Sequence, residues 1–298
     1  MSVCVVGSLN FDIICRVAHL PKPGETVAGS GLMRLPGGKG GNQAAAAARA
    51  GAPTIFVGGV GRDEPGELMV AALAASGVDV SGVVVFDDVA TGHAFVSVAE
   101  SGENSIVLAL GANSALSPEH VITASTADHA VVLAQLECPV ETVAAAFRAA
   151  PDSIKILNAA PATEAGAALF PLIDILIVNE TELAFFAGAD DLVGLDAVVA
   201  AARGLMAGPD QIVVVSLGAA GAVAVLADGI ERVEGRSATV VDTTGAGDCF
   251  CGVLAAKLAE GAPLGQAMVW ANAAASLSVE RHGAMPAMPT RAEIEAVL

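Results

Sequence analysis

Short apolar runs rich in β-branched residues alternate along this chain with alanine-rich stretches, and this alternation restricts the fold more than any other feature. Strands that alternate with helices are joined by right-handed crossovers into a mostly parallel sheet. Because the runs are almost continuously apolar, we expect them to be buried on both faces. The expected strands are residues 3–6, 54–57, 131–134, 154–157, 175–178, 212–215 and 238–241, and the expected helices are residues 42–50, 66–75, 140–149, 180–187, 195–206, 246–260 and 264–279.

Residues 11–35 and 91–110 interrupt this rhythm. From Thr91 to Leu110 apolar and polar residues alternate with a period of two around Ser101-Gly102-Glu103, which predicts a β-hairpin. Such a hairpin stands off the main sheet as a lid or an oligomer contact, or it is an edge hairpin that only covers core. Neither a repeat nor a low-complexity linker divides residues 1–298, so we expect a single α/β domain with this small β excursion.

The chain is strongly acidic, with a formal net charge of -18 from 14 basic and 32 acidic residues. This charge repels nucleic acid and anionic lipid, so we expect neither as a partner. The five cysteines form no CxxC pair and no Cys/His cluster, and no apolar stretch approaches the roughly 20 residues of a membrane span. We therefore expect a cytoplasmic protein without a zinc site, in which Cys249 and Cys251 pack rather than act as a redox switch.

The motif with the clearest chemistry is Asp242-Thr243-Thr244-Gly245-Ala246-Gly247-Asp248, at the start of an expected helix. A glycine-rich turn that leads into a helix directs several N–H groups and the positive end of the helix dipole at one point, which suits a phosphoryl group in transfer. Asp248 is the candidate base for an acceptor hydroxyl, because phosphoryl transfer demands little early proton removal. The alternative is a helix cap after an ordinary turn.

A second glycine-rich turn, Gly37-Gly38-Lys39-Gly40-Gly41-Asn42-Gln43, also begins an expected helix. Lys39 and Asn42 would present donors to a hydroxylated ligand as readily as to a phosphate. A dinucleotide-binding fingerprint and a Walker A loop are both absent from the sequence.

These two motifs, in this order, resemble the signature regions of the ribokinase-like (phosphofructokinase B) sugar kinase family. Further similar segments extend the resemblance over essentially the whole chain, among them residues 7–12, 23–26, 102–104, 111–113, 135–137, 179–182 and 216–218. The resemblance implies a three-layer α/β sandwich with a small β-sheet lid formed by residues 11–35 and 91–110. It also implies a homodimer formed through that lid.

The resemblance implies a role for each matching residue. The anion hole and base would be Gly245, Ala246, Gly247 and Asp248, and the sugar would contact Asn10, Asp12, Gly38, Lys39, Gly40, Asn42, Glu137 and Asp248. Glu182, together with Asn179, would organise Mg²⁺, and the nucleotide would contact Asn179, Ser216, Gly218, Gly221, Gly247 and Asn272. An activating K⁺ would be held by Asp242, Thr244, Ser278, Arg281 and Gly283, although Ala287 stands where the family usually has a serine.

The function implied is ATP-dependent phosphorylation of D-ribose at its 5-hydroxyl, with ribose 5-phosphate and ADP as products. Two alternatives stay open from the sequence. The acceptor could be another small sugar, a sugar acid or a nucleoside, or the chain could be a non-catalytic sugar-binding regulator, since a fold does not guarantee activity.

Overall fold

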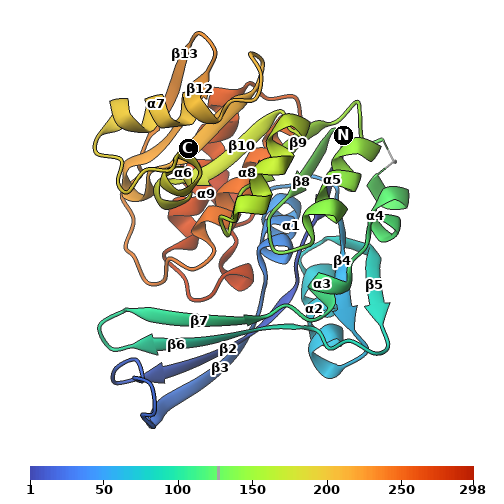
Figure 1. Ribbon diagram of the computed structural model, residues 1–298, viewed down its shortest axis with the longest axis vertical. Coiled ribbons are helices and arrows are strands. Elements are labelled where there is room, and N and C mark those ends of the chain that lie inside the picture. Colours follow the sequence, from blue (N-terminus) through green and yellow to red (C-terminus); the bar gives the residue numbers. More distant parts are fainter. Residues whose placement is uncertain (126–127) are drawn as a thin grey trace.

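The computed structural model describes residues 1–125 and 128–298, and its main feature is a sheet of nine strands in the order β13-β12-β11-β10-β9-β8-β1-β4-β5 (Figure 1). Neighbours from β11 to β5 pair in parallel, whereas β12 pairs antiparallel with both β11 and β13. The strands are β1 (Val3–Val6), β4 (Thr54–Gly61), β5 (Asp79–Phe86), β8 (Val131–Ala134), β9 (Ile154–Asn158), β10 (Ile175–Asn179), β11 (Ile212–Ser216), β12 (Gly221–Leu226) and β13 (Gly229–Glu234).

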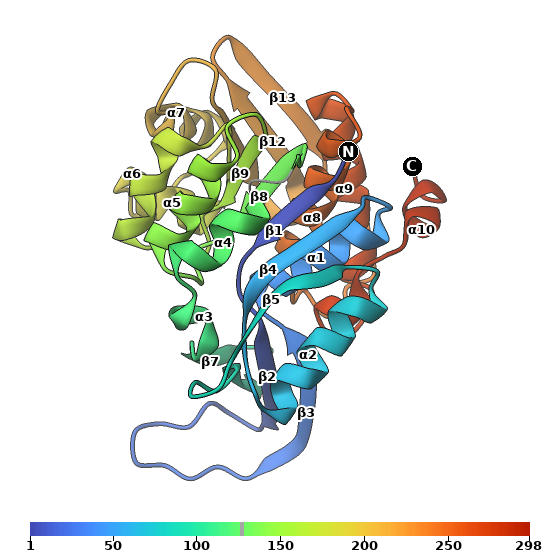
Figure 2. The ribbon, with the colours of Figure 1, turned by 90° about the vertical axis from the view of Figure 1, so that its right-hand side faces the viewer.

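Helices cover both faces of this sheet, which confirms the predicted α/β sandwich (Figure 2). One face carries α1 (Lys39–Arg49), α2 (Glu64–Ala75), α8 (Ala246–Ala259) and α9 (Leu264–Ser278). The other carries α4 (Pro118–Ser125), α5 (Val140–Ala149), the 3-10 segment η1 (Glu164–Leu172), α6 (Glu180–Ala187) and α7 (Leu195–Leu205). The short helices α3 (Ala112–Ala115) and α10 (Arg291–Glu295) complete the set, with η2 (Gly218–Ala220) and η3 (Met285–Ala287).

The strands are apolar along their whole length because the side chains of each strand pack into two hydrophobic cores, one on each face of the sheet. In β1, Val3 and Val5 pack in one hydrophobic cluster, and Cys4 and Val6 pack in the cluster on the opposite face. All four side chains are fully buried. This is the environment in which a strand needs no polar face.

A second sheet of four strands stands apart from the main one (Figure 1). Its order is β3 (Gly29–Gly37), β2 (Asn10–Val17), β6 (Gly92–Ala99) and β7 (Asn104–Ala109). β2 pairs in parallel with β6, while β2 with β3 and β6 with β7 pair antiparallel.

Among the described residues, no helix is long and apolar enough to cross a membrane.

The expectation of a strand at residues 238–241 is wrong. This segment is irregular, and the backbone N–H groups of Val241 and Asp242 donate to the carbonyl of Val279 at the end of α9. Val240 and Val241 are exposed, so their apolar character does not reflect burial in a sheet. The helix α1 also begins at Lys39, three residues before the expected position, because the glycines at 40 and 41 continue the helix.

Candidate functional site

The start of α1 lies against the chain that leaves β1, and glycines make this approach possible. Gly38 has a φ of +87°, and a Cβ there would lie 2.6 Å from the backbone nitrogen of Asn10. A Cβ on Gly40 would lie 2.6 Å from the backbone nitrogen of Ser8. The first turn of α1 is therefore fixed beside the segment that carries the expected sugar ligands.

The helices α1 and α8 are also in close contact. A Cβ on Gly252 of α8 would lie 2.3 Å from the backbone oxygen of Gln43 on α1. The contact brings Asp248, in the first turn of α8, against two amides of α1: Asn42 Nδ2 donates to Asp248 Oδ2 over 2.9 Å, and Gln43 Nε2 donates to Asp248 Oδ1 over 3.0 Å. Asp248 is 8 % exposed, so each of its oxygens is held by a hydrogen bond in a largely buried position.

The expected sugar residues gather around the same point. Glu137, at the end of β8, accepts hydrogen bonds at Oε2 from the hydroxyl of Ser8 and, over 3.1 Å, from the backbone N–H of Lys39. Asn10 is buried, and its Oδ1 accepts a 2.8 Å hydrogen bond from Asn113 Nδ2. The structure thus brings residues of β2, α1 and α8, and of the loops that follow β1 and β8, to one site next to the small sheet.

Asp12 and Lys39 have perturbed ionisation in this acidic environment. Burial, together with the neighbouring negative charges of Glu137 and Asp248, raises the pKa of Asp12 to about 7. For Lys39, burial lowers the pKa, but the carboxylates of Asp248, Glu137 and Glu182 outweigh this effect and the pKa is raised. Lys39 therefore stays charged, while Asp12 titrates near neutral pH.

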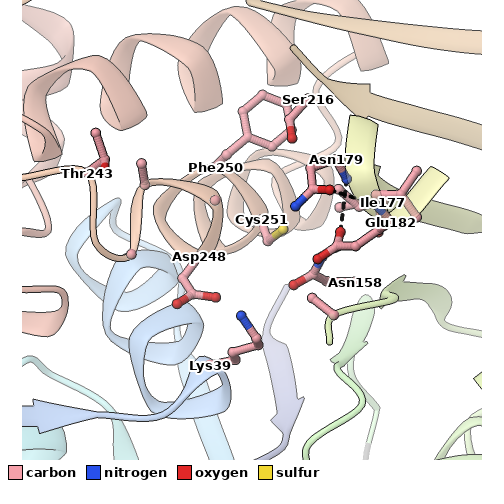
Figure 3. Close-up of a pocket in the computed structure, with 15 residues that line it drawn as sticks. Lys39, Asn158, Ile177, Asn179, Glu182, Ser216, Thr243, Asp248, Phe250 and Cys251 are labelled. Carbon is pink, nitrogen blue, oxygen red and sulfur yellow. Dashed lines mark hydrogen bonds between the residues drawn. The ribbon is translucent and has the colours of Figure 1, made fainter. Parts of the chain in front are cut away.

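A cavity of about 200 Å³ adjoins Asp248 (Figure 3). Lys39 points into it between Asp248 and the pair Asn179 and Glu182, and the first turn of α8 forms part of its wall. Its lining includes the expected residues Lys39, Asn179, Glu182, Ser216, Gly245, Ala246, Gly247 and Asp248. Gly245, at the N-cap of α8, has a φ of +77°, a left-handed conformation that glycine adopts without strain.

Asn179 and Glu182 form a capping box at the start of α6. The Glu182 backbone N–H donates to Asn179 Oδ1 over 2.8 Å, and the Asn179 N–H donates to Glu182 Oε2 over 2.9 Å. Burial raises the pKa of Glu182 despite this hydrogen bond. The two side chains thus have a structural role and still face the cavity, where carboxylate and amide oxygens are suitable ligands for Mg²⁺ or its waters.

Asp242 organises the loop before α8. Its Oδ1 accepts hydrogen bonds from both the N–H and the hydroxyl of Thr244, and its Oδ2 accepts one of 2.9 Å from the Gly283 N–H. Burial alone would raise the pKa of Asp242, but these hydrogen bonds outweigh burial and lower it. A carboxylate that stays ionised between two backbone turns fits a monovalent cation. The described residues contain no group of three or more His, Cys, Asp or Glu side chains that could bind a metal.

The remaining residues expected to contact the nucleotide or K⁺ do not line this cavity. Gly221 is buried at the start of β12, where a Cβ would lie 2.0 Å from the carbonyl oxygen of Val233, and Gly218 begins the exposed turn η2 before it. Asn272 Nδ2 donates to the carbonyl of Glu234 over 3.0 Å, and so links α9 to β13. Ser278 is buried near the end of α9, and Arg281 pairs with Glu293.

Three amides that sequence reasoning assigned no role also belong to the site. Gln43 bonds directly to Asp248, Asn158 lines the cavity, and Asn113 fixes both the backbone of Leu9 and the side chain of Asn10. A signal was available for each: Gln43 and Asn113 lie in the quoted motifs, and Asn158 is the polar residue that ends an apolar strand. Each of them, however, bonds a partner more than 100 residues away in the chain.

Comparison with known proteins identifies relatives along the entire chain. The pfkB family of carbohydrate kinases matches residues 1–291. A ribokinase from Haemophilus influenzae is 40% identical, over 98% of this chain and 96% of its own length, and one from Bacillus subtilis is 36% identical over 100% and 99%.

Solved structures give the same result. The ribokinase of Thermotoga maritima superposes with a TM-score of 0.91 at 32% identity, covering 100% of this chain and 99% of its own. The ribokinase of Arabidopsis thaliana, complexed with ribose and ATP, has a TM-score of 0.87 at 34% identity, with 99% and 98% covered.

Proposed function

The chain belongs to the pfkB family of carbohydrate kinases, and from this membership we propose that it transfers the γ-phosphoryl group of ATP to the 5-hydroxyl of D-ribose, giving ribose 5-phosphate and ADP. The observation that carries the proposal is the position of Asp248. It lies between a cluster of hydrogen-bonding residues suited to a sugar and a cavity suited to phosphates. A base at that boundary can contact an acceptor hydroxyl that faces a phosphoryl group.

The sugar site offers acceptors for hydroxyl protons. Asp12 and Glu137 supply carboxylate oxygens, and Asn42 contributes a buried Oδ1 that has no hydrogen-bond partner among the described residues. A buried acceptor without a partner costs about 1 to 3 kcal/mol, so a sugar hydroxyl that donates to it gains affinity. Asn10, Gly38, Lys39 and Gly40 complete this site in the proposal, which discriminates against analogues that lack the hydroxyls.

For the chemical step, Asp248 accepts the proton of the attacking hydroxyl. The first N–H groups of α8, from Gly245 through Gly247, would stabilise the charge on the phosphoryl oxygens together with the positive end of the helix dipole. Of these, the Ala246 N–H also donates to the Thr243 carbonyl over 3.2 Å. Lys39, which points into the cavity beside Asp248, adds a full positive charge.

Two cations belong to the proposal. Asn179 and Glu182 would hold Mg²⁺ through oxygen atoms or bound water, and the ion would offset charge on the ATP phosphates. Asp242, with the carbonyls of Thr244, Ser278, Arg281 and Gly283, would hold K⁺. The buried Ala287 offers no side-chain ligand there.

The nucleotide would extend from the cavity past Ser216 and the turn at Gly218 and Gly221 toward Asn272. The small sheet would act as a lid that excludes water, which otherwise competes for the phosphoryl group.

We also propose a homodimer through the small sheet. Its strand β7 is exposed along its whole length and carries Ile106, Val107 and Leu108. A Val107→Glu variant should be a monomer by light scattering where the parent is a dimer, and a parent that is itself monomeric would refute this part.

The five cysteines form no disulfide, which suits the cytoplasm.

The decisive experiment measures ATP-dependent phosphorylation of ribose, deoxyribose, fructose, 2-keto-3-deoxygluconate and nucleosides, with and without K⁺. Ribose should be the best acceptor, and Asp248→Asn should lower kcat by at least about 10²-fold, within the range for loss of a positioned base. Turnover of a different acceptor would replace ribose and keep the mechanism. Ribose binding without turnover would instead support a sugar-binding regulator.

A further inference from the structure

Gln43 lies behind Asp248, away from the cavity. Its side chain is fully buried, it does not line the cavity, and its amide makes three hydrogen bonds to other side chains. It therefore differs from Asn42, which holds the other oxygen of Asp248 but also belongs to the proposed sugar site.

The orientation of the Gln43 amide is fixed by its partners. Gln135 Nε2 donates to Gln43 Oε1 over 2.6 Å, which requires the amide nitrogen of Gln43 to face the other way. There it donates both of its protons, to Asp248 Oδ1 over 3.0 Å and to Asn158 Oδ1 over 3.1 Å. Asn158 is fixed in turn, because its Nδ2 donates to the carbonyl of Ile177 on β10.

These bonds connect Asp248 to the rigid central sheet. Gln135 directly follows β8, Asn158 ends β9, and Ile177 is in β10. We propose that Gln43 is a positioning residue for phosphoryl transfer: it fixes the carboxylate of Asp248 relative to the ends of β8, β9 and β10, so that the other oxygen meets the sugar hydroxyl in line with the phosphoryl group. The inference rests on the proposed kinase function, since positioning matters only if Asp248 acts on an acceptor.

The first test is Gln43→Met, which keeps the length of the side chain and removes its hydrogen bonds. Displacement of a reacting group by about 1 Å can cost about 10²-fold in rate, so we expect kcat for ribose to fall by about 10 to 100-fold. The ribose Kd from calorimetry should stay within about threefold, because Gln43 is fully buried and is not among the proposed sugar contacts. Parent-like kcat in Gln43→Met would overturn the inference.

Gln211→Met is the matched control. Gln211 is 6 % exposed, and its amide also makes three hydrogen bonds, with the backbone of Phe170, Ile173 and Ala207. It precedes β11, at the opposite end of that strand from the cavity residue Ser216. Gln211→Met should lower the melting temperature to a similar extent yet keep the parental kcat per folded molecule. An equal loss of kcat in both variants would mean that Gln43 is only structural.

A double-mutant cycle separates action through Asp248 from any other effect. In an Asp248→Asn background, Gln43→Met should lower the residual kcat by less than about threefold, because residues that act as a unit are not additive. If Gln43→Met costs the same factor in both backgrounds, the positioning role is refuted. An absence of turnover by the parent on every acceptor would refute the proposed function and the inference together, whereas an active parent with an active Gln43→Met refutes the inference alone.

Discussion

Ribose binding should become tighter as the pH rises through neutrality, because of Asp12. Its pKa of about 7 in the free protein means that the carboxylate is about one-tenth ionised at pH 6 and about nine-tenths ionised at pH 8. The ionised form accepts stronger hydrogen bonds from sugar hydroxyls, at both of its oxygens, whereas protonation turns one oxygen into a donor. If the bound sugar requires this form, the Kd for ribose falls about tenfold between pH 6 and pH 8.

Isothermal titration calorimetry at several pH values measures this directly. At pH 6, binding should release close to one proton, which is detected by comparing buffers of different ionisation enthalpy. Asp12→Asn is the control, since it cannot titrate and should bind ribose more weakly with little pH dependence. A Kd that is constant over this range, or an equal slope in Asp12→Asn, would refute the reasoning.

The same pKa has a consequence for stability. Because the folded-state pKa is raised from 3.8 to about 7, the folded protein binds this proton more tightly than the unfolded chain does. The contribution of Asp12 to stability is therefore full below pH 3.8 and is lost as the pH rises through 7, by up to about 4 kcal/mol. Asp12→Asn should thus raise the free energy of unfolding at pH 8 and gain less at pH 5. No difference between the two pH values would contradict a raised pKa.

Three further predictions concern packing, metal and thiols. Gly252→Ala should lower the free energy of unfolding in urea by about 1 to 3 kcal/mol or more, since its Cβ would clash with the α1 backbone. The control is Gly204→Ala, at an exposed position of α7 with open space, which should raise the free energy of unfolding by up to about 1 kcal/mol. Equal effects would refute this packing. Glu182→Gln keeps the cap on α6 but should raise the Mg²⁺ concentration for half-maximal activity about tenfold, and an unchanged value would remove Glu182 from the metal site. In the native protein a thiol reagent should label only the partly exposed Cys15 quickly, because the other four cysteines are buried. Burial also raises the pKa of Cys249 to about 12. Fast labelling of a second thiol would contradict this prediction.

The strand and helix order was predictable because burial on both faces gives a strong local signal. The strands at residues 3–6 and 131–134 and the helices at 140–149 and 180–187 have the predicted bounds. The strands β5, β12 and β13 were missed. β5 and β13 lie at the edges of the sheet and are half-buried or exposed, with a mixed composition, whereas β12 is a buried internal strand that the apolar pattern should have identified. Residues 238–241 carry the opposite lesson: a β-branched sequence on the surface need not form a strand.

The site was predictable in part, and the limit was again physical. Motifs identify groups that are close in the chain, such as Gly245 and Asp248. They do not identify which distant group completes a hydrogen bond: Gln43 meets Asp248 only because glycine at 252 allows α1 and α8 to touch. A buried amide that bonds a carboxylate has the same sequence signal as one that bonds a helix backbone, and only the packing separates them.

The charge of the sugar site also bears on which acceptor fits. Asp12, Glu137 and Asp248 place three carboxyl groups together against the single ammonium of Lys39, and the charges of Glu137 and Asp248 add to burial, the main cause, in raising the pKa of Asp12. A neutral sugar enters without a charge penalty and donates hydroxyl protons to the carboxylates. A sugar acid or a phosphorylated sugar would bring a further negative charge next to them, which disfavours it as an acceptor. The same repulsion acts on the product once the phosphoryl group has been transferred, so the groups proposed to recognise ribose should also weaken the binding of ribose 5-phosphate and favour its release.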